Sequence, residues 1–197
     1  MNQDNVLAVF QLASLTERRE GLAWYATARD ICSDLAAKHN VCEEVAAGVV
    51  AALSPRNRWE RNVQDADALI TAYRFGGREQ AEKTKVCTFG KNREKAIRIL
   101  EEAFADGGVL MILSGPKLKE FYSCIRGIDG EVCIDGHAYC IWAGERTGLK
   151  DVPAIGVKLR RQIKADYAAA AAKVNLTPAQ LQAVTWVTWR RLHGVTK

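Results

Sequence analysis

VLMILSGPKLKEFY, residues 109–122, decides the fold: an apolar turn leads through Ser114 and Gly115 into Pro116. Proline suits the first position of a helix, where its missing amide proton costs nothing. The segment therefore predicts a helix, a tight hairpin and a second helix.

Downstream of this hairpin, residues 127–130 predict a turn and Val132-Cys-Ile134 a short extended piece. Asp135 follows directly, at the point where a helix over residues 136–146 should begin. Aspartate is a preferred N-cap residue, so the pattern predicts Asp135 as the cap of that helix.

Helical periodicity also dominates the rest of the chain, and strand-like alternation is almost absent. Thr16 is the expected cap of a helix ending near His39, with Leu22, Tyr25, Ala26 and Ile31 or Leu35 facing inward. Gly76-Gly77 should break the helix that begins near Arg58, and Thr177-Pro178 should begin the last one. We expect an all-α protein with further helices over residues 43–53, 58–73, 91–105, 157–174 and 178–192.

The net charge of +5 is unevenly distributed. The first fifty residues hold four basic and seven acidic side chains, so the remaining residues carry the whole positive excess. Basic groups concentrate at residues 83–98 and 158–164, and such clusters suit contacts with phosphates. A charge run is also what a solvated helix face presents, so this feature permits DNA binding without requiring it.

The apolar stretches are too short to span a bilayer, and the N-terminal residues lack the features of a signal peptide. We therefore expect a cytoplasmic, nucleoid-associated protein. The six cysteines lie among apolar neighbours and form no C-x-x-C pair, which favours buried reduced thiols. Cys133, His137 and Cys140 lack a fourth ligand at a usual spacing, so no metal site is expected.

Four motifs in order resemble the helix-hairpin-helix DNA glycosylase and AP lyase superfamily, which includes endonuclease III. Leu113-Ser-Gly-Pro-Lys117 resembles its hairpin, and Val132-Cys-Ile-Asp135-Gly-His137 its apolar-apolar-Asp-x-His step, 18 residues after the lysine. Two further motifs of the family have counterparts upstream. Its apolar-Ser-x-Gln/Asn element resembles Ser54-Pro-Arg56, and its Gly-x-x-x-x-Lys-Ala step resembles Gly90-Lys-Asn-Arg-Glu-Lys95-Ala96. The hairpin has one glycine where the family usually has two. The end of the chain resembles phage proteins, so we place this protein in a divergent branch, in a bacterial or phage-infected cell.

This resemblance implies two helical lobes with a DNA-binding cleft between them. We expect one two-lobed domain over residues 1–197, with lobe A at about 36–128 and lobe B at about 1–35 plus 129–197. The partner would be double-stranded DNA, bound by a monomer that has no membrane attachment. No cysteine follows Cys140, so the iron-sulfur cluster of endonuclease III is not expected, and no other cofactor is implied.

The resemblance assigns Asp135 as the catalytic carboxylate. Cleavage of an N-glycosidic bond builds positive charge on the deoxyribose, and a fixed carboxylate stabilises it. The alternative for Asp135 is an ordinary helix cap. Lys117 would attack C1′ as a neutral amine and permit strand cleavage, or else would only contact phosphate or solvent. His137 would orient Asp135 or serve structure alone.

The resemblance also implies residues that contact DNA. Amides around Ser114 and Gly115 would face a phosphate, with Lys119 beside them, and the hairpin carbonyls could hold a monovalent cation. Arg56, with Asn57 next to it, would fill the gap left by a flipped base or contact a phosphate. Lys91 and Arg93 belong to the first basic cluster.

Three functions remain open at this point. The first is a DNA glycosylase that excises a damaged or modified base by base flipping, with AP lyase activity if Lys117 is the nucleophile. The second is a transferase acting on a hypermodified base in phage DNA. The third is a helix-hairpin-helix DNA-binding module without chemistry.

Overall fold

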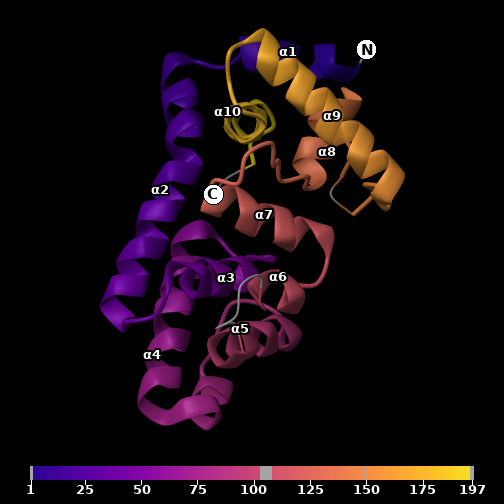
Figure 1. The fold of residues 1–197 in the computed structure, drawn as a ribbon. Helices are drawn as coiled ribbons and strands as arrows, with labels where there is room; N and C mark the ends of the chain where they lie inside the picture. The colour runs from indigo at the N-terminus through magenta and orange to yellow at the C-terminus, as the bar shows by residue number, and fades with distance from the viewer. Residues whose placement is uncertain (1, 103–107, 149, 196–197) are drawn as a thin grey trace. The chain divides into compact units, whose positions relative to one another are not determined.

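The computed structural model describes residues 2–102, 108–148 and 150–195, and these residues contain helices and no β-strand (Figure 1). The all-α prediction is therefore confirmed. The helices are α1 (Asn2–Gln11), α2 (Leu15–His39), α3 (Glu43–Leu53), α4 (Trp59–Lys83), α5 (Gly90–Glu102), α6 (Gly108–Ile112), α7 (Pro116–Arg126), α8 (Gly136–Ala143), α9 (Val157–Lys173) and α10 (Pro178–Leu192). None of these helices is long and apolar enough to cross a membrane.

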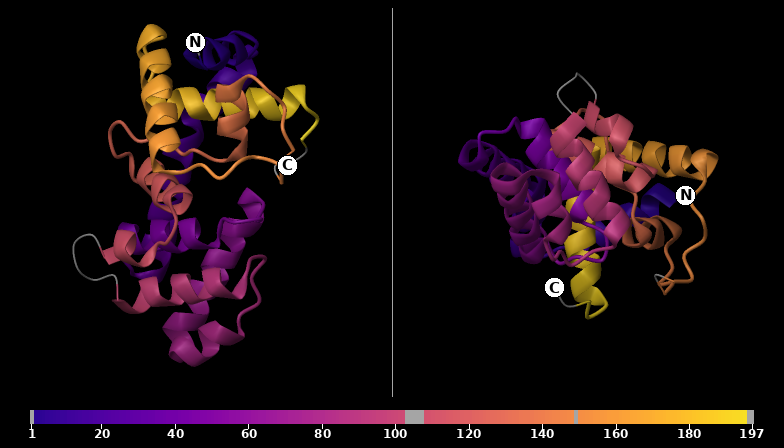
Figure 2. Two further views of the ribbon diagram at one scale, coloured as in Figure 1. Left: turned by 90° about the vertical axis from the view of Figure 1, so that its right-hand side faces the viewer. Right: turned by 90° about the horizontal axis from the view of Figure 1, so that it is seen from below.

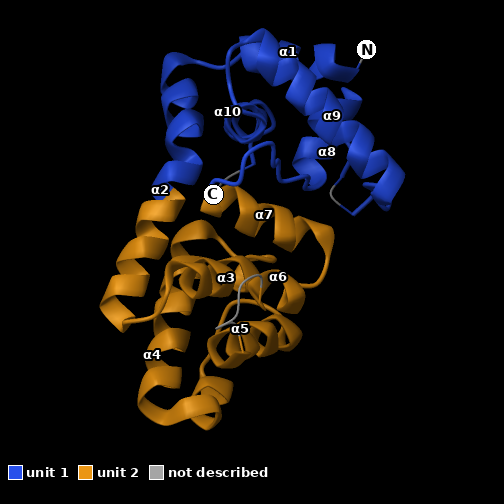
Figure 3. Ribbon diagram, viewed as in Figure 1, with its two compact units in different colours: residues 1–27, 127–197 blue, residues 28–126 orange. Residues whose placement is uncertain are grey.

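The chain divides into two compact units (Figure 3). Unit 1 combines residues 1–27 with residues 127–197, and unit 2 is the continuous segment 28–126. The boundary at residue 27 falls inside α2, so about half of this helix belongs to each unit.

Unit 2 is built around α3, whose residues Val45 to Leu53 are all buried. Helices α4, α5, α6 and α7 all contact it, and Figures 1 and 2 show it inside this unit. The approach is close at Gly48, where an added Cβ would lie 2.7 Å from Cγ1 of Val109. Helix α3 can be apolar along nearly its whole length because four other helices cover it.

Unit 1 packs α1, α8, α9 and α10 around a second core that includes Ile141, Ile163 and Leu181. The first half of α2 joins them through Gly21, where an added Cβ would lie 2.4 Å from the backbone Cα of Val184 in α10. The Tyr25 hydroxyl lies 2.8 Å from Oε1 of Gln182, which ties the same two helices together.

Several predicted helix ends are confirmed. Helices α3 and α10 have the expected bounds, and Thr177 forms a capping box with Gln180. Gly76 and Gly77 have non-helical dihedral angles inside α4, which is the expected break. Helix α8 is shorter than predicted because Gly144 ends it in the left-handed conformation. The predicted end of the fifth helix near Ala105 lies outside the described residues.

The start of α2 differs from the prediction. The cap is Ser14, whose Oγ accepts from the Glu17 amide at 3.2 Å, while Glu17 Oε2 accepts from the Ser14 amide at 2.8 Å. Leu22 and Ala26 are exposed, so they were wrongly assigned to the inward face. The buried stripe contains Gly21, Tyr25, Ala28, Cys32 and Leu35. Helix α1 was not predicted at all.

Candidate functional site

Asp135 lies at the start of α8 in unit 1, after the buried residues Val132, Cys133 and Ile134. Its Oδ1 accepts a hydrogen bond from the Ala138 amide at 2.8 Å, so the predicted N-cap is confirmed. The side chain is half-buried, and the cap uses Oδ1. Helix geometry therefore holds a carboxylate in one place at the edge of the unit 1 core.

A buried tyrosine supports the same turn. The Tyr167 hydroxyl donates to the Ala138 carbonyl oxygen at 3.2 Å, and Tyr167 is fully buried. Burial raises the pKa of Tyr167, which keeps the hydroxyl protonated and able to donate. Helix α9 is thereby fixed against the first turn of α8, next to the Asp135 cap.

Cations of α9 line the segment that leads into Asp135. Arg160 Nη1 donates to the Ile134 carbonyl oxygen at 3.1 Å, and Lys164 Nζ donates to Glu131 Oε2 at 2.8 Å. Both residues belong to the basic cluster at 158–164. This cluster thus has a structural role beside the candidate carboxylate, in addition to its charge. His137 is half-buried in the first turn of α8.

The hairpin lies in unit 2, between α6 and α7. Gly115 has φ of 89°, a conformation that glycine adopts readily, and an added Cβ there would meet nothing within 4 Å. Ser114, Gly115, Pro116 and Lys117 are exposed, whereas Lys119 is half-buried. Buried Leu113 and Leu118 anchor the two sides. The hairpin tip is therefore open to close approach by a phosphate.

Arg56 and Asn57 lie in a second exposed loop of unit 2, between α3 and α4. Arg56 has φ of 57°, which is uncommon for a residue other than glycine. Asn57 Nδ2 donates to Asp65 Oδ2 at 3.0 Å, and the Cys87 amide donates to the same oxygen at 2.6 Å. Arg61 Nε donates to Asp65 Oδ1 at 2.7 Å.

Asp65 therefore joins the loop 54–58 to the loop 84–89, and we name it the loop lock. Its side chain is buried, with a residue exposure of 2%. This role could not be recognised from the sequence, because an aspartate within a regular helix resembles any solvated position. Only its place beside buried Ala66, on the inward face of α4, could have drawn attention to it.

The two loops meet around Phe89. Thr88 Oγ1 donates to the Pro55 carbonyl oxygen at 2.9 Å, and Arg56 Cζ lies 5.2 Å from the Phe89 ring centroid. Lys91 Nζ lies 5.9 Å from the same centroid. Arg56, Asn57 and Lys91, predicted from separate motifs, are thus brought together. Arg93 instead donates to the Thr84 carbonyl oxygen at 3.1 Å, which connects α5 to the start of the loop 84–89.

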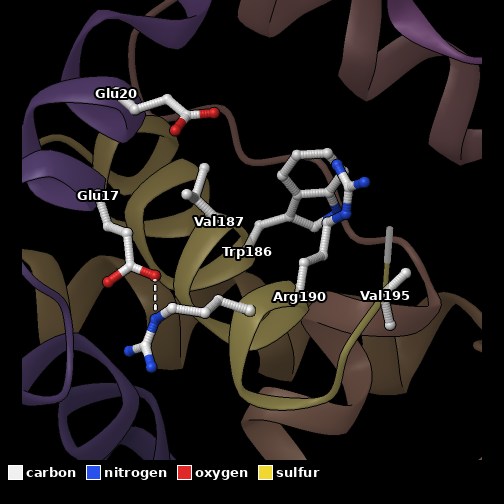
Figure 4. Close-up of a pocket in the computed structure, with 7 residues that line it drawn as sticks. Glu17, Glu20, Trp186, Val187, Arg190 and Val195 are labelled. Carbon is white, nitrogen blue, oxygen red and sulfur yellow. Dashed lines mark hydrogen bonds and ion pairs between the residues drawn. The ribbon is translucent and has the colours of Figure 1, made fainter. Parts of the chain in front are cut away.

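A pocket of about 290 Å³ in unit 1 contains none of the predicted site residues (Figure 4). The Arg190 guanidinium lies 4.4 Å from the Trp186 ring centroid, and Glu17 pairs with Arg191 across the floor of the pocket. Both pairs are internal contacts that tie α10 to itself and to α2. The lining residues are Glu17, Glu20, Trp186, Val187, Arg190, Arg191 and Val195.

Within the described ranges, no three His, Cys, Asp or Glu side chains are grouped so that they could hold a metal ion. Cys140 Sγ donates instead to the Thr147 carbonyl oxygen at 3.5 Å. All six cysteines are free thiols, but Cys42 and Cys87 lie in loops and are exposed, so the expectation of a buried thiol is wrong for these two.

Comparison with known proteins assigns a family. Residues 1–193 match the model of DUF7178, described as a family of unknown function, and the chain belongs to this family. No curated protein and no solved structure matches the chain.

Proposed function

We propose that this protein is a DNA glycosylase of the helix-hairpin-helix type, which removes a damaged or modified base after flipping it out of the DNA. The observation that carries the proposal is the Asp135 cap. A carboxylate held by its own helix terminus after a buried apolar segment is suited to stabilising positive charge that develops on a sugar.

The charge around Asp135 is consistent with this role. The Ala138 amide at the start of α8 donates to the carboxylate. Arg160 and Lys164 approach the same segment from α9 and would attract the phosphates that flank an extruded nucleotide. Asp135 would act as a stabiliser of the sugar or as an activator of water.

The open hairpin supports DNA as the partner. Gly115 leaves free space above the backbone between α6 and α7, and the exposed Lys117 follows in the first turn of α7. Amides at such a turn bind a phosphate without reading its sequence. Lys117 would add AP lyase activity if, after water has displaced the base, its amine attacks C1′ of the abasic sugar and forms a Schiff base with loss of water.

The test is base release from duplexes that each carry a different lesion or modified base, with borohydride added to trap a Schiff base. Asp135→Asn keeps a good helix cap and removes the negative charge, so we expect base release to fall at least about a hundredfold with little change in folding. Asp129→Asn, in an exposed turn of the same unit, is the matched control. Lys117→Ala should abolish trapping and leave base release in place.

Two results would contradict the proposal. Equal base release by Asp135→Asn and wild type on every substrate would remove the carboxylate from the chemistry. Mass spectrometry that finds a changed base without an abasic site would replace the glycosylase with a transferase on the same scaffold.

A further inference from the structure

Phe89 is an exposed aromatic residue surrounded by cations in unit 2. Its residue exposure is 44%, and Arg56 and Lys91 both lie within 6 Å of its ring centroid. An aromatic ring left partly in water, with guanidinium and ammonium groups beside it, is the composition that single-stranded nucleic acids bind.

The position of these groups is fixed by the surrounding structure. Asp65 binds both loops, and Thr88 connects them through Pro55. Asn92 Nδ2 donates to Thr88 Oγ1 at 2.9 Å, which continues the connection into α5. Arg56 keeps its left-handed backbone conformation within this frame, although that conformation costs about 1 kcal/mol or more.

The electrostatics beside Phe89 favour an anion. Lys95 lies one turn after Lys91 on α5, and its Nζ is 3.5 Å from Asn92 Oδ1. Burial lowers the pKa of Lys95, and the positive charge of Lys91 lowers it further. A phosphate bound near these two lysines would offset both unfavourable effects.

We propose that Phe89, Arg56 and Lys91 form a stacking platform for an unpaired base, with the adjacent phosphate near Lys91 and Lys95 and with Asp65 as the positioning residue. The proposal rests on DNA as the partner and deepens it. It specifies that unit 2 recognises a strand with an unstacked base, so intact duplex is the weaker ligand.

The test compares binding of a labelled single strand, a duplex of the same sequence and that duplex with one unpaired base, by fluorescence anisotropy at fixed salt. Wild type should bind the single strand and the unpaired-base duplex more tightly than the intact duplex. Phe89→Ala should weaken the first two between about fivefold and a hundredfold, and the intact duplex less than about twofold. Phe89→Trp should retain binding, and its indole fluorescence should be quenched by the single strand.

Phe75→Ala is the matched control, because Phe75 is an exposed phenylalanine of the same unit, with 89% exposure. It should leave all three affinities unchanged. Asp65→Asn should lose the preference for the unpaired base while retaining the salt dependence of duplex binding. Thermal unfolding of each variant shows whether the fold is intact.

Equal affinity of Phe89→Ala and wild type for the single strand would overturn the platform, as would an equal loss on all three ligands. These outcomes are independent of base release. A protein that binds as described and releases no base from any duplex would therefore contradict only the proposed function.

Discussion

Asp135 in unit 1 and Asp65 in unit 2 both accept hydrogen bonds from backbone amides, but they do so in different surroundings. Asp135 caps the start of α8 through Oδ1 and is half-buried. Asp65 lies within α4, is 2% exposed and binds three donors from two loops and its own helix. Asp135 is thus a carboxylate that is partly exposed to solvent, whereas both oxygens of Asp65 are engaged in hydrogen bonds that hold the fold.

Each unit contains a glycine that packs closely against a neighbouring helix, Gly21 in unit 1 and Gly48 in unit 2. Substitution of these glycines should give the largest loss of stability. Gly21→Ala in unit 1 should cost more than about 3 kcal/mol, because its Cβ would overlap the backbone of Val184. Gly48→Ala in unit 2 should cost only about 1–2 kcal/mol, since the overlap is with a methyl group of Val109. Urea unfolding of both variants measures the difference. Equal losses would mean that α10 shifts as easily as a valine side chain.

Removing the loop lock is the next largest change. Asp65→Ala should cost about 2 kcal/mol, because the Cys87 amide and the Asn57 side chain lose their acceptor in a part-buried setting. Hydrogen exchange should rise in residues 84–89 of unit 2. Asp34→Ala, an exposed aspartate on α2 in the same unit, is the control and should change stability by less than about 0.5 kcal/mol.

Changing the cap should have a smaller effect on stability. Asp135→Ala should cost about 1 kcal/mol, and Asp135→Asn only a few tenths, because asparagine caps as well as aspartate. Thermal unfolding checks both values. If Asp135→Ala proves as costly as Asp65→Ala, the two carboxylates share a structural role and the distinction between them fails.

The smallest expected effect is a pH dependence in unit 2. Burial raises the pKa of the Asp67 carboxyl, but hydrogen bonds from Lys38 and His39 outweigh burial, so this pKa lies below its ordinary value of 3.8. The stabilisation that these hydrogen bonds give the folded protein is therefore present above pH 3.8. It is lost as the pH falls through the lowered pKa that Asp67 has in the folded state. It should be well under about 1 kcal/mol, since these groups are partly exposed. Unfolding curves of Asp67→Asn and wild type should converge in acid; a constant difference down to pH 2 would contradict this.

Local signals predicted much of the helical architecture. Thr177-Pro178 and the apolar run before Ser54 specify helix ends through the residues next to them, and Asp135 follows the same logic. Ser14 and Thr16 can both cap a helix, but only Ser14 has a glutamate three residues later. This capping-box pattern identifies Ser14 from the sequence alone, so the assignment of the cap to Thr16 was avoidable.

The tertiary part of the candidate site could not be predicted in the same way. Asp65 and Phe89 acquire their roles from a contact between two loops about 30 residues apart, and no local pattern in either loop specifies its partner. Arg56 and Lys91 were identified from separate motifs, and the structure places both beside Phe89. The cleft between two lobes stays a prediction.

The division of the chain into a continuous unit and a composite unit has a consequence for synthesis. Residues 28–126 are synthesised before residues 127–197, so unit 2 can fold before unit 1 is complete. The core of unit 1 must wait for α8, α9 and α10, which pack against α1 in the folded protein. The unit that holds the hairpin can therefore fold before the unit that holds Asp135.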